Sequence, residues 1–570
     1  MNRANPIDVL IVGAGPTGLT LACQLRRLGV DFRIIDKNQE PSTTSKAIGL
    51  QYRVSEVLTW MGLFDRFLSR GVTGTGVSFY AGGERILHLR LDRLHGMSGR
   101  GAFEPKSIVL PQSVTESLLI EDLAERGGEV ERGTSFVEFT QESDGVVSRI
   151  RRLDGGEEVV GSRYLVGCEG PHSAIRKQAG LSFEGKTYPV SYFMADVELD
   201  WEVDRGDVRV WIHEDGMFSA IPMPGERRWR LFVESGKKVE EGATEVTLDL
   251  VRRLMTERTG DRVTRATSPT WLSEFRISCR MVDRFANGRV FLAGDAAHVH
   301  SPTGGQGITT GVQDAYNLAW KLDMMLRGVA PDSLLDTYTE ERLPVVRRVL
   351  KNTDQTASVF LAHSRARRLF RDHVVLPLLR SRTMQRHLTR RLSQLDINYR
   401  RSSLSVHQEK ALIGGVRVHA GDRTPDVVFR DAATGEETTL FERLGRSRPI
   451  ALFGVDAGLD AGEAGGPPPR IRRSMEALGC LGIDCSLVLS EEARRHGGET
   501  LIDTGAEFRR LYGVGGEFLY LIRPDGYVGL FQRPVDERAL QAYAAKLFGT
   551  NAVDGAFGAS ETRVPVEAGR

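Results

Sequence analysis

Three glycines near the start of the chain have the spacing of a phosphate-binding turn. The segment DVLIVGAGPTGLTLACQLRRLGVDFRIIDK begins at Asp8 and contains Gly13, Gly15 and Gly18. The first glycine permits a tight turn, the second lets backbone approach a pyrophosphate, and the third allows a helix to pack closely on a strand. Asp36 ends the second apolar stretch, where a carboxylate can accept hydrogen bonds from ribose hydroxyls. The pattern predicts a βαβ unit that binds a dinucleotide.

An aspartate and a glycine-rich loop occur together much further along the chain. A short apolar stretch ends at Leu292, and GDAAHVHSPTGGQGITTGVQDAYNLAWKL follows from Gly294. Apolar residues recur at helical spacing after this loop, which predicts a packed helix whose amino terminus faces the loop. The positive end of such a helix stabilises negative charge on a bound group.

A third segment, YLVGCEGPHSAIRKQAG, starts at Tyr164 and combines a strand, a turn and an arginine-bearing helix. In chain order the segments that start at Asp8, Tyr164 and Gly294 resemble the glycine-rich, DG and GD motifs, respectively, of the FAD-dependent aromatic hydroxylases, the class A flavoprotein monooxygenases. The resemblance covers essentially the whole chain. The carboxy-terminal part of the chain is similar to that of phenol hydroxylase and of the polyketide and rifampicin hydroxylases.

The resemblance implies FAD as cofactor and suggests roles for the motif residues. Asp295 matches a carboxylate that binds a ribityl hydroxyl of FAD, and Gln112 matches a glutamine that reaches FAD. Pro302 and residues 304–307 match backbone that lies against the isoalloxazine ring. The predicted cofactor-binding residues are Gly13, Gly15, Pro16, Thr17, Gly18, Asp36, Lys37, Lys46, Gln112, Glu169, Asp295, Pro302, Gly305, Gln306, Gly307 and Ile308.

Four positions depart from the family pattern. Glu169 stands where the family has aspartate, and Thr309 where it usually has asparagine. Lys46 replaces an arginine, which keeps the charge but loses the bidentate fork. Ile48 occupies the place where some phenol hydroxylases carry an acidic residue near the substrate hydroxyl. The sequence therefore names no catalytic base.

The reaction that the resemblance implies is hydroxylation of a phenolic or polyketide-type aromatic substrate. NADPH or NADH reduces the flavin as a transient reductant, O2 adds at flavin C4a, and the hydroperoxide delivers one oxygen atom to the ring. The cofactor carries the difficult chemistry, while the protein holds it and excludes water. A Baeyer–Villiger-type or antibiotic-modifying oxidation on the same fold stays open as an alternative.

The spread of the motifs predicts an α/β fold in which the cofactor domain is discontinuous. A Rossmann-like, glutathione-reductase-like FAD-binding domain with a helical extension is expected from residues 1–76, 105–189 and 271–400. Alternating apolar and polar residues predict an inserted antiparallel sheet for the substrate, from residues 77–104 and 190–270. The residues predicted to line the substrate cavity are Trp211, Phe218, Ile221 and Phe232.

Residues 405–555 are expected to form a third domain, which resembles the thioredoxin-like carboxy-terminal domain of phenol hydroxylase. Cys480 and Cys485 have four residues between them, so the CxxC redox motif is absent. The expected role of this domain is packing or contact between protomers, and a homodimer is compatible with the sequence. Residues 556–570 lack periodicity and are expected to form a flexible tail.

The charge composition limits the classes of partner that the protein is expected to bind. The 570 residues carry 76 Lys and Arg against 75 Asp and Glu, a net charge of +1, so no global charge attracts nucleic acid or an anionic membrane. Residues 365–401 hold eleven arginines and two aspartates without a nucleic-acid-binding motif, which leaves nucleic-acid binding as a remote alternative.

The sequence predicts no membrane span, no signal peptide and no metal site. No apolar run reaches the roughly 18 residues of a membrane span, and no signal peptide is recognisable. Five scattered cysteines favour the reducing cytoplasm. His298 and His300 form an HxH without a third ligand at suitable spacing, so no metal is predicted.

Overall fold

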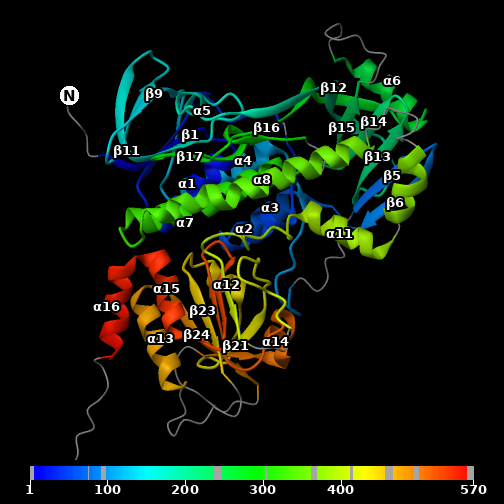
Figure 1. Cartoon of the computed structure of the whole chain (residues 1–570). Helices are drawn as coiled ribbons and strands as arrows, with labels where there is room; N and C mark the ends of the chain where they lie inside the picture. Colours follow the sequence, from blue (N-terminus) through cyan, green and yellow to red (C-terminus); the bar gives the residue numbers. More distant parts are fainter. Residues whose placement is uncertain are drawn as a thin grey trace, which may run out of the picture.

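The computed structural model describes residues 6–45, 47–74, 76–90, 98–201, 203–235, 246–301, 305–360, 369–379, 381–410, 415–455, 467–491 and 500–561. These residues form three sheets of eight strands and one sheet of three strands. In Figure 1 two of the large sheets share the upper part of the molecule with the long helices, and the carboxy-terminal domain lies below them.

The first sheet brings the three sequence motifs together. Strand β1 (Ile7–Val12) runs parallel to β2 (Phe32–Asp36) on one side and to β11 (Glu157–Gly167) on the other. Strand β18 (Val290–Leu292) is parallel to β11 in turn. The carboxyl ends of these neighbouring strands meet at one edge, which is where ligands bind in open α/β sheets.

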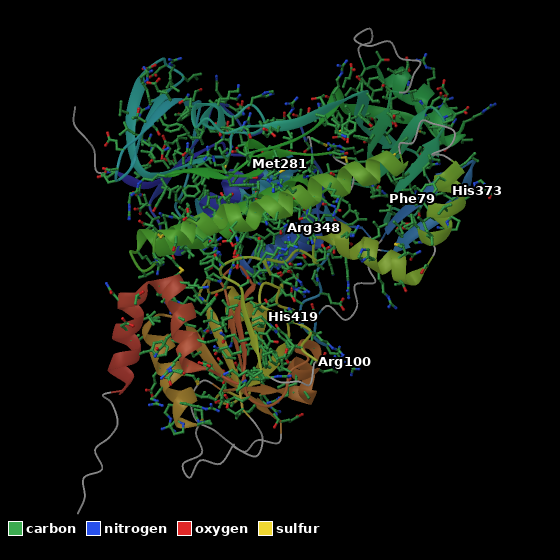
Figure 2. The ribbon with its side chains drawn as sticks, in the orientation of Figure 1. Phe79, Arg100, Met281, Arg348, His373 and His419 are labelled. Atoms are coloured by element: carbon green, nitrogen blue, oxygen red, sulfur yellow. The ribbon has the colours of Figure 1, made fainter. Side chains whose placement is uncertain are left out.

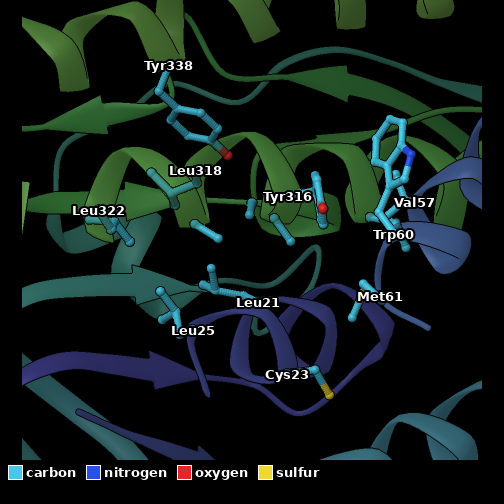
Figure 3. Packing of buried hydrophobic residues seen from close by; sticks show 14 of the residues in the cluster. Leu21, Cys23, Leu25, Val57, Trp60, Met61, Tyr316, Leu318, Leu322 and Tyr338 are labelled. Atoms are coloured by element: carbon cyan, nitrogen blue, oxygen red, sulfur yellow. The ribbon is translucent and has the colours of Figure 1, made fainter. Parts of the chain in front are cut away.

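Helices and further strands complete the cofactor domain. Helix α1 (Pro16–Leu28) packs on helix α7 (Gly307–Leu326), and Figure 3 shows Leu21 and Leu25 of α1 facing Leu318 and Leu322 of α7. The other elements are β3 (Gly49–Leu50), α2 (Tyr52–Trp60), α3 (Phe64–Arg70), β4 (Val72–Thr73), β7 (Ile108–Val109), α4 (Gln112–Glu125), β8 (Val130–Arg132), β9 (Ser135–Gln141), β10 (Val146–Arg151), α5 (Ala174–Gln178), β17 (Ala286–Asn287) and α8 (Ser333–Phe360).

The second sheet is the inserted one, and each of its eight strands pairs with at least one antiparallel neighbour. Its order is β19-β16-β12-β15-β14-β13-β5-β6, and the one parallel pairing joins β13 to β5. The strands are β5 (Gly76–Ala81), β6 (Glu84–Arg90), β12 (Glu184–Leu199), β13 (Asp207–His213), β14 (Gly216–Pro222), β15 (Arg228–Glu234), β16 (Ala266–Met281) and β19 (His298–Val299). Helix α6 (Leu248–Thr259) packs on one face through Leu250, Val251, Leu254 and Met255.

The domain boundaries expected from the sequence differ from this arrangement. Strands β12 and β16 extend past both expected limits, 190 and 270, because each is one continuous strand of 16 residues paired with the other. The long strand pair therefore runs from the substrate sheet into the cofactor domain and ties the two domains together.

The third sheet belongs to the carboxy-terminal domain. Its central strand β23 (Ile450–Gly454) is parallel to β24 (Asp484–Ser490) and antiparallel to β26 (Phe518–Ile522). The remaining strands are β20 (Val406–Glu409), β21 (Val428–Asp431), β22 (Glu437–Thr439), β25 (Thr500–Asp503) and β27 (Val528–Arg533). Its helices are α12 (Leu440–Leu444), α13 (Pro469–Cys480), α14 (Glu507–Tyr512), α15 (Glu537–Phe548) and α16 (Thr550–Glu561). The thioredoxin-like character of this domain stays a prediction.

The start of the expected flexible tail is wrong. Helix α16 continues through Glu561, because Ala556 and Phe557 are buried in the carboxy-terminal core. The part of the tail from 562 onward lies outside the described residues. Within the described chain, no helix has the length and apolar character needed to cross a membrane.

Buried charges join the carboxy-terminal domain to the cofactor domain. Arg523 in the turn after β26 pairs with Glu341 of α8, whose Oε2 also accepts from Lys321 Nζ of α7 at 2.8 Å. All three side chains are fully buried. Separating the domains would leave uncompensated buried charges, which is costly. These ion pairs therefore hold α7 and α8 against the carboxy-terminal domain.

Candidate active site

One large cavity joins the motif loops to the inserted sheet. Its volume is about 840 Å³. At one end it is lined by the glycine-rich turn, the DG segment and the GD loop, and at the other by β5, β6 and β12 to β15. The cavity therefore has a polar, backbone-lined end in the cofactor domain and an apolar end, called the chamber below, on one face of the inserted sheet.

A side chain is excluded at two of the three glycines of the first motif and would meet open space at the third. Gly13 has φ of 104°, and a Cβ there would lie 2.5 Å from the carbonyl oxygen of Cys168. A Cβ on Gly18 would overlap the carbonyl oxygen of Gly13. A Cβ on Gly15 would meet nothing within 4 Å. The open space in front of Gly15, at the amino terminus of α1, fits a pyrophosphate.

Asp36 lies at the same edge of the sheet, where its carboxylate orders the turn. Its Oδ2 accepts from the amide of Ala14 at 2.7 Å, and its Oδ1 accepts from the amide of Asn38 at 2.9 Å. The guanidinium of Arg132 lies 4.0 Å from Oδ1 and also lines the cavity. Sequence reasoning missed Arg132, because it ends the short strand β8 (Val130–Arg132), which lies outside the three motifs.

Glu169 caps a helix. Its Oε1 accepts from the hydroxyl of Ser173 at 2.8 Å and from the amide of Ile175 at 2.9 Å. Burial raises the pKa of this carboxyl, and the two donors oppose the rise. Arg176, on the same short helix, donates to the carbonyl oxygens of Ala296 and Pro171 at 2.8 Å. It therefore fastens the DG segment to the GD loop.

The GD loop and the start of α7 form the boundary between the two ends of the cavity. Asp295, Gly305, Gln306, Gly307 and Ile308 all line it. Gly294 and Gly311 leave space for Thr17, because a Cβ on either glycine would overlap the Thr17 hydroxyl. This close approach fixes the amino terminus of α7 beside the glycine-rich turn.

Thr309, where the family usually has asparagine, is fully buried and does not line the cavity. Its hydroxyl accepts from the amide of Gln51 at 3.0 Å. The residue therefore joins α7 to the segment before α2 (Tyr52–Trp60).

The two histidines of the HxH sequence have separate environments. His298 Nε2 lies 2.7 Å from Asp314 Oδ2, and Arg342 Nε donates to the other oxygen of that carboxylate at 2.6 Å. His300 lines the cavity with Nδ1 placed 2.9 Å from the Ser301 carbonyl oxygen. Burial lowers the pKa of His300 to about 4, so the ring is neutral at pH 7. Among the described residues no group of three or more His, Cys, Asp or Glu side chains is placed to hold a metal.

The remaining predicted cofactor residues divide into two groups. Pro16, Thr17, Lys37 and Gln112 line the cavity, and Gln112 Nε2 donates to Glu116 Oε1 at 2.8 Å. Lys46 and Pro302 lie outside the described residues. Gly18 does not line the cavity, because it packs against the turn.

The predicted substrate residues fall on both faces of the inserted sheet. Ile221 and Phe232 line the chamber. Trp211 and Phe218 do not line it, and their assignment is wrong. Both belong to the core on the opposite face, with Trp229 and helix α6 (Leu248–Thr259). Side chains alternate along a strand, so Phe218 points away from the face on which Ser219 and Ile221 lie.

Several chamber residues carry no sequence signal. Helix α11 (Arg382–Ser393) contributes Leu388 and Leu392 from outside the inserted sheet. Phe79 on β5 lines the chamber from the inserted sheet. Figure 2 shows it in the upper part of the molecule, whereas His419 marks the carboxy-terminal domain below. Arg230 is a charged residue in an apolar wall. On strands β5, β6 and β12 to β15 the full set is Gly76, Val77, Phe79, Leu89, Met194, Val208, Val210, Met217, Ser219, Ile221, Arg230 and Phe232.

Known proteins share this arrangement. Residues 6–353 match the family model described as FAD binding domain. A flavin-dependent monooxygenase of Mycobacteroides abscessus is 37% identical over 79% of this chain and 89% of its own length. The 6-methylpretetramide 4-monooxygenase of Streptomyces rimosus is 34% identical over 92% of this chain and 91% of its own. The solved structure of the anhydrotetracycline hydroxylase OxyS from Streptomyces rimosus has a TM-score of 0.73 and 29% identity over 95% of this chain and 99% of that one.

The residues present fit FAD. The space before Gly15 is open, the Asp36 carboxylate lies beside the same turn, and the cavity continues past the start of α7 into the chamber. Together with a family match over more than half of the chain, this geometry identifies the protein as a member of the FAD-dependent monooxygenase family of aromatic hydroxylases.

Proposed function

We propose that this FAD-dependent monooxygenase hydroxylates a phenolic, polyketide-type aromatic compound that lies in the chamber. The observation that carries the proposal is the single cavity that runs from the glycine-rich turn to the apolar face of the inserted sheet. Relatives named for rifampicin, 6-methylpretetramide and pentachlorophenol act on large or substituted aromatic compounds. The apolar lining of the chamber suits a ring system of this kind.

The cofactor contacts follow from the cavity lining. We assign the FAD pyrophosphate to the amino terminus of α1 at Gly15 and Pro16, and the ribose to Asp36. We assign the ribityl chain to Asp295, and the pyrimidine edge of the flavin to the start of α7. The partial positive charge at that helix end stabilises negative charge on the reduced ring.

Bound FAD supplies the redox chemistry, with NAD(P)H as reductant and O2 as the second substrate. The chain contributes binding and exclusion of water. Leu388 and Leu392 cover the chamber from helix α11, and Phe79 and Phe232 line its walls. His300 is neutral at pH 7 because burial lowers its pKa, so it adds no charge to the flavin edge. A dry site strengthens each electrostatic interaction inside it.

The test is aerobic NAD(P)H oxidation by the purified FAD-containing protein with phenols and aromatic polyketides, followed by mass spectrometry of the products. A product one oxygen atom heavier with an intact ring is expected. A ring-expanded product would support the Baeyer–Villiger alternative. Oxidation of NAD(P)H that no phenol or polyketide stimulates would contradict the proposal.

Three further proposals concern the whole chain. A cytoplasmic location accords with the five scattered cysteines of the sequence, which suit a reducing compartment. A homodimer stays a proposal that light scattering of the purified protein tests. Absence of nucleic-acid binding through residues 365–401 is tested by salt-dependent retention on DNA.

A further inference from the structure

A buried ion pair lies in the apolar wall of the chamber. Arg230 on β15 donates from Nε to Asp196 Oδ1 at 2.6 Å and from Nη2 to Asp196 Oδ2 at 2.7 Å. The two residues are 2% and 6% exposed. The guanidinium carbon lies 5.2 Å from the centre of the Trp271 ring. These contacts hold the guanidinium in one orientation.

Strand register places this pair in the same wall as the apolar chamber residues. Asp196 pairs with Arg230, which pairs with Ile221 on the next strand. Two residues further along, Met194 pairs with Phe232, which pairs with Ser219. Arg230, Ile221, Phe232, Met194 and Ser219 all line the cavity. The guanidinium is thus part of the surface that a bound ring system contacts.

One nitrogen of this guanidinium has no hydrogen-bond partner in the described part of the chain. Nη1 of Arg230 is buried and makes no hydrogen bond to any described residue. A buried donor without an acceptor is energetically unfavourable, because it has lost its hydrogen bonds to water. A guanidinium that already uses two of its nitrogens on a carboxylate has its remaining donors directed at fixed angles. A ligand oxygen in the chamber would satisfy them.

The charge of the pair selects the kind of oxygen. Asp196 already neutralises Arg230 through two hydrogen bonds. A ligand carboxylate would bring an unbalanced negative charge into an apolar wall, which is costly. An uncharged carbonyl oxygen accepts the hydrogen bond without that cost.

We infer that Arg230 recognises a carbonyl oxygen on the polycyclic aromatic substrate through its Nη1 donor. The inference rests on the proposed function, since it concerns the substrate of that same chamber. It deepens the proposal from an aromatic compound to a ring system that carries both a phenol and a ketone.

Two matched tricyclic phenols test the inference. A hydroxyxanthone carries the ring ketone, and the corresponding hydroxyxanthene has a methylene group at that place. Titration calorimetry measures their binding to the oxidised FAD-containing protein without NAD(P)H, so no turnover occurs. The wild type is expected to bind the ketone roughly tenfold more tightly, as for a hydrogen bond to a charged group. Equal binding of the two compounds would overturn the inference.

The Arg230→Met variant is expected to lose this preference while its affinity for the methylene compound changes little. Because it leaves Asp196 buried without its partner, the double variant Asp196→Leu/Arg230→Met is measured beside it. Replacing both partners by apolar groups avoids an uncompensated charge. A preference for the ketone that persists in the double variant with full FAD content would overturn the inference. Arg228→Met, at an exposed position of the same strand, is the matched control and retains the preference.

A third arm tests the charge argument. A carboxylate in place of the xanthone ketone should bind the wild type more weakly than the ketone does. Asp196→Asn leaves Arg230 uncompensated and should reverse that order, whereas an unchanged order would contradict the inference. The failure of the inference and the failure of the proposed function are distinguishable. If the protein binds the ketone selectively but no phenol stimulates its NAD(P)H oxidation, only the proposed function is contradicted.

Discussion

The two ends of the cavity are built in different ways. The cofactor end is made of backbone, with glycines whose missing Cβ atoms create the space, as at Gly15. The chamber is made of side chains that project from one face of a sheet, such as Ile221 and Phe232. A backbone site depends on a few local conformations, while a side-chain site depends on which face of each strand is covered. The two ends should therefore respond differently to substitution.

The largest expected difference lies within the inserted sheet. Phe218→Ala should lower the free energy of unfolding by about 3–5 kcal/mol, because the ring is fully buried against the α6 side. Phe232→Ala removes a half-buried ring from the chamber, so it should cost less stability and weaken substrate binding. Urea unfolding and substrate titration measure the two effects. Weakened substrate binding in a folded Phe218→Ala protein would contradict the assignment of faces.

At the cofactor end the contrast is between two glycines three residues apart. Gly15→Val should leave the FAD-free protein as stable as the wild type but weaken FAD binding at least about 100-fold, roughly 3 kcal/mol, because the side chain enters the pyrophosphate space. Gly18→Ala should instead destabilise the FAD-free protein by up to about 3 kcal/mol, since its methyl group overlaps the Gly13 carbonyl. Thermal melting of both apoproteins and FAD titration separate these outcomes. Normal FAD affinity in Gly15→Val would contradict the pyrophosphate assignment.

This contrast explains how much the sequence could predict. The glycine-rich turn was predictable because each glycine answers a local demand, such as the φ of 104° at Gly13. The convergence of the three motifs follows from parallel pairing of β18, β11 and β1, whose carboxyl ends share an edge. Both are consequences of strand direction and turn geometry, which sequence patterns carry.

The chamber was only partly predictable, because its strands are apolar on both faces. On β14, Phe218 and Ala220 pack toward α6 while Met217, Ser219 and Ile221 face the chamber. The alternation does not indicate which face a helix covers, so it cannot separate the aromatic residues that line the chamber from those packed under α6. Leu388 and Leu392 reach the chamber from α11, which is far from the inserted strands in sequence, and such a long-range contact leaves no local pattern. The ion pair of Asp196 and Arg230 depends in the same way on strand register.

A smaller effect is expected from His300 at the boundary between the two ends. Burial lowers its pKa from 6.5 to about 4, so the unfolded chain binds the proton more readily than the folded one. This contribution to stability is fully present above pH 6.5 and is lost as pH falls toward 4. From pH 7 to pH 5 the loss amounts to about 2 kcal/mol. His300→Gln should remove that part of the pH dependence in urea unfolding.

The matched control for His300 is His373→Gln. His373 is exposed and lies beside the β5–β6 edge of the inserted sheet (Figure 2). Its replacement controls for the loss of an exposed imidazole. An identical pH profile for wild type and His300→Gln would mean that the ring at position 300 is not held neutral by burial.

The smallest expected effect concerns Thr309, which lies on α7 but does not line the cavity. Its hydroxyl accepts from the amide of Gln51, so Thr309→Val should lower the free energy of unfolding by about 1 kcal/mol through loss of one hydrogen bond. Thr309→Ser keeps the hydroxyl and should recover most of that loss. Neither variant should alter FAD affinity or the visible absorption of bound flavin. A shifted flavin spectrum in Thr309→Val would place this side chain against the ring, and the boundary between the backbone-lined end and the packed interior of α7 would then have to be drawn one turn further into the helix.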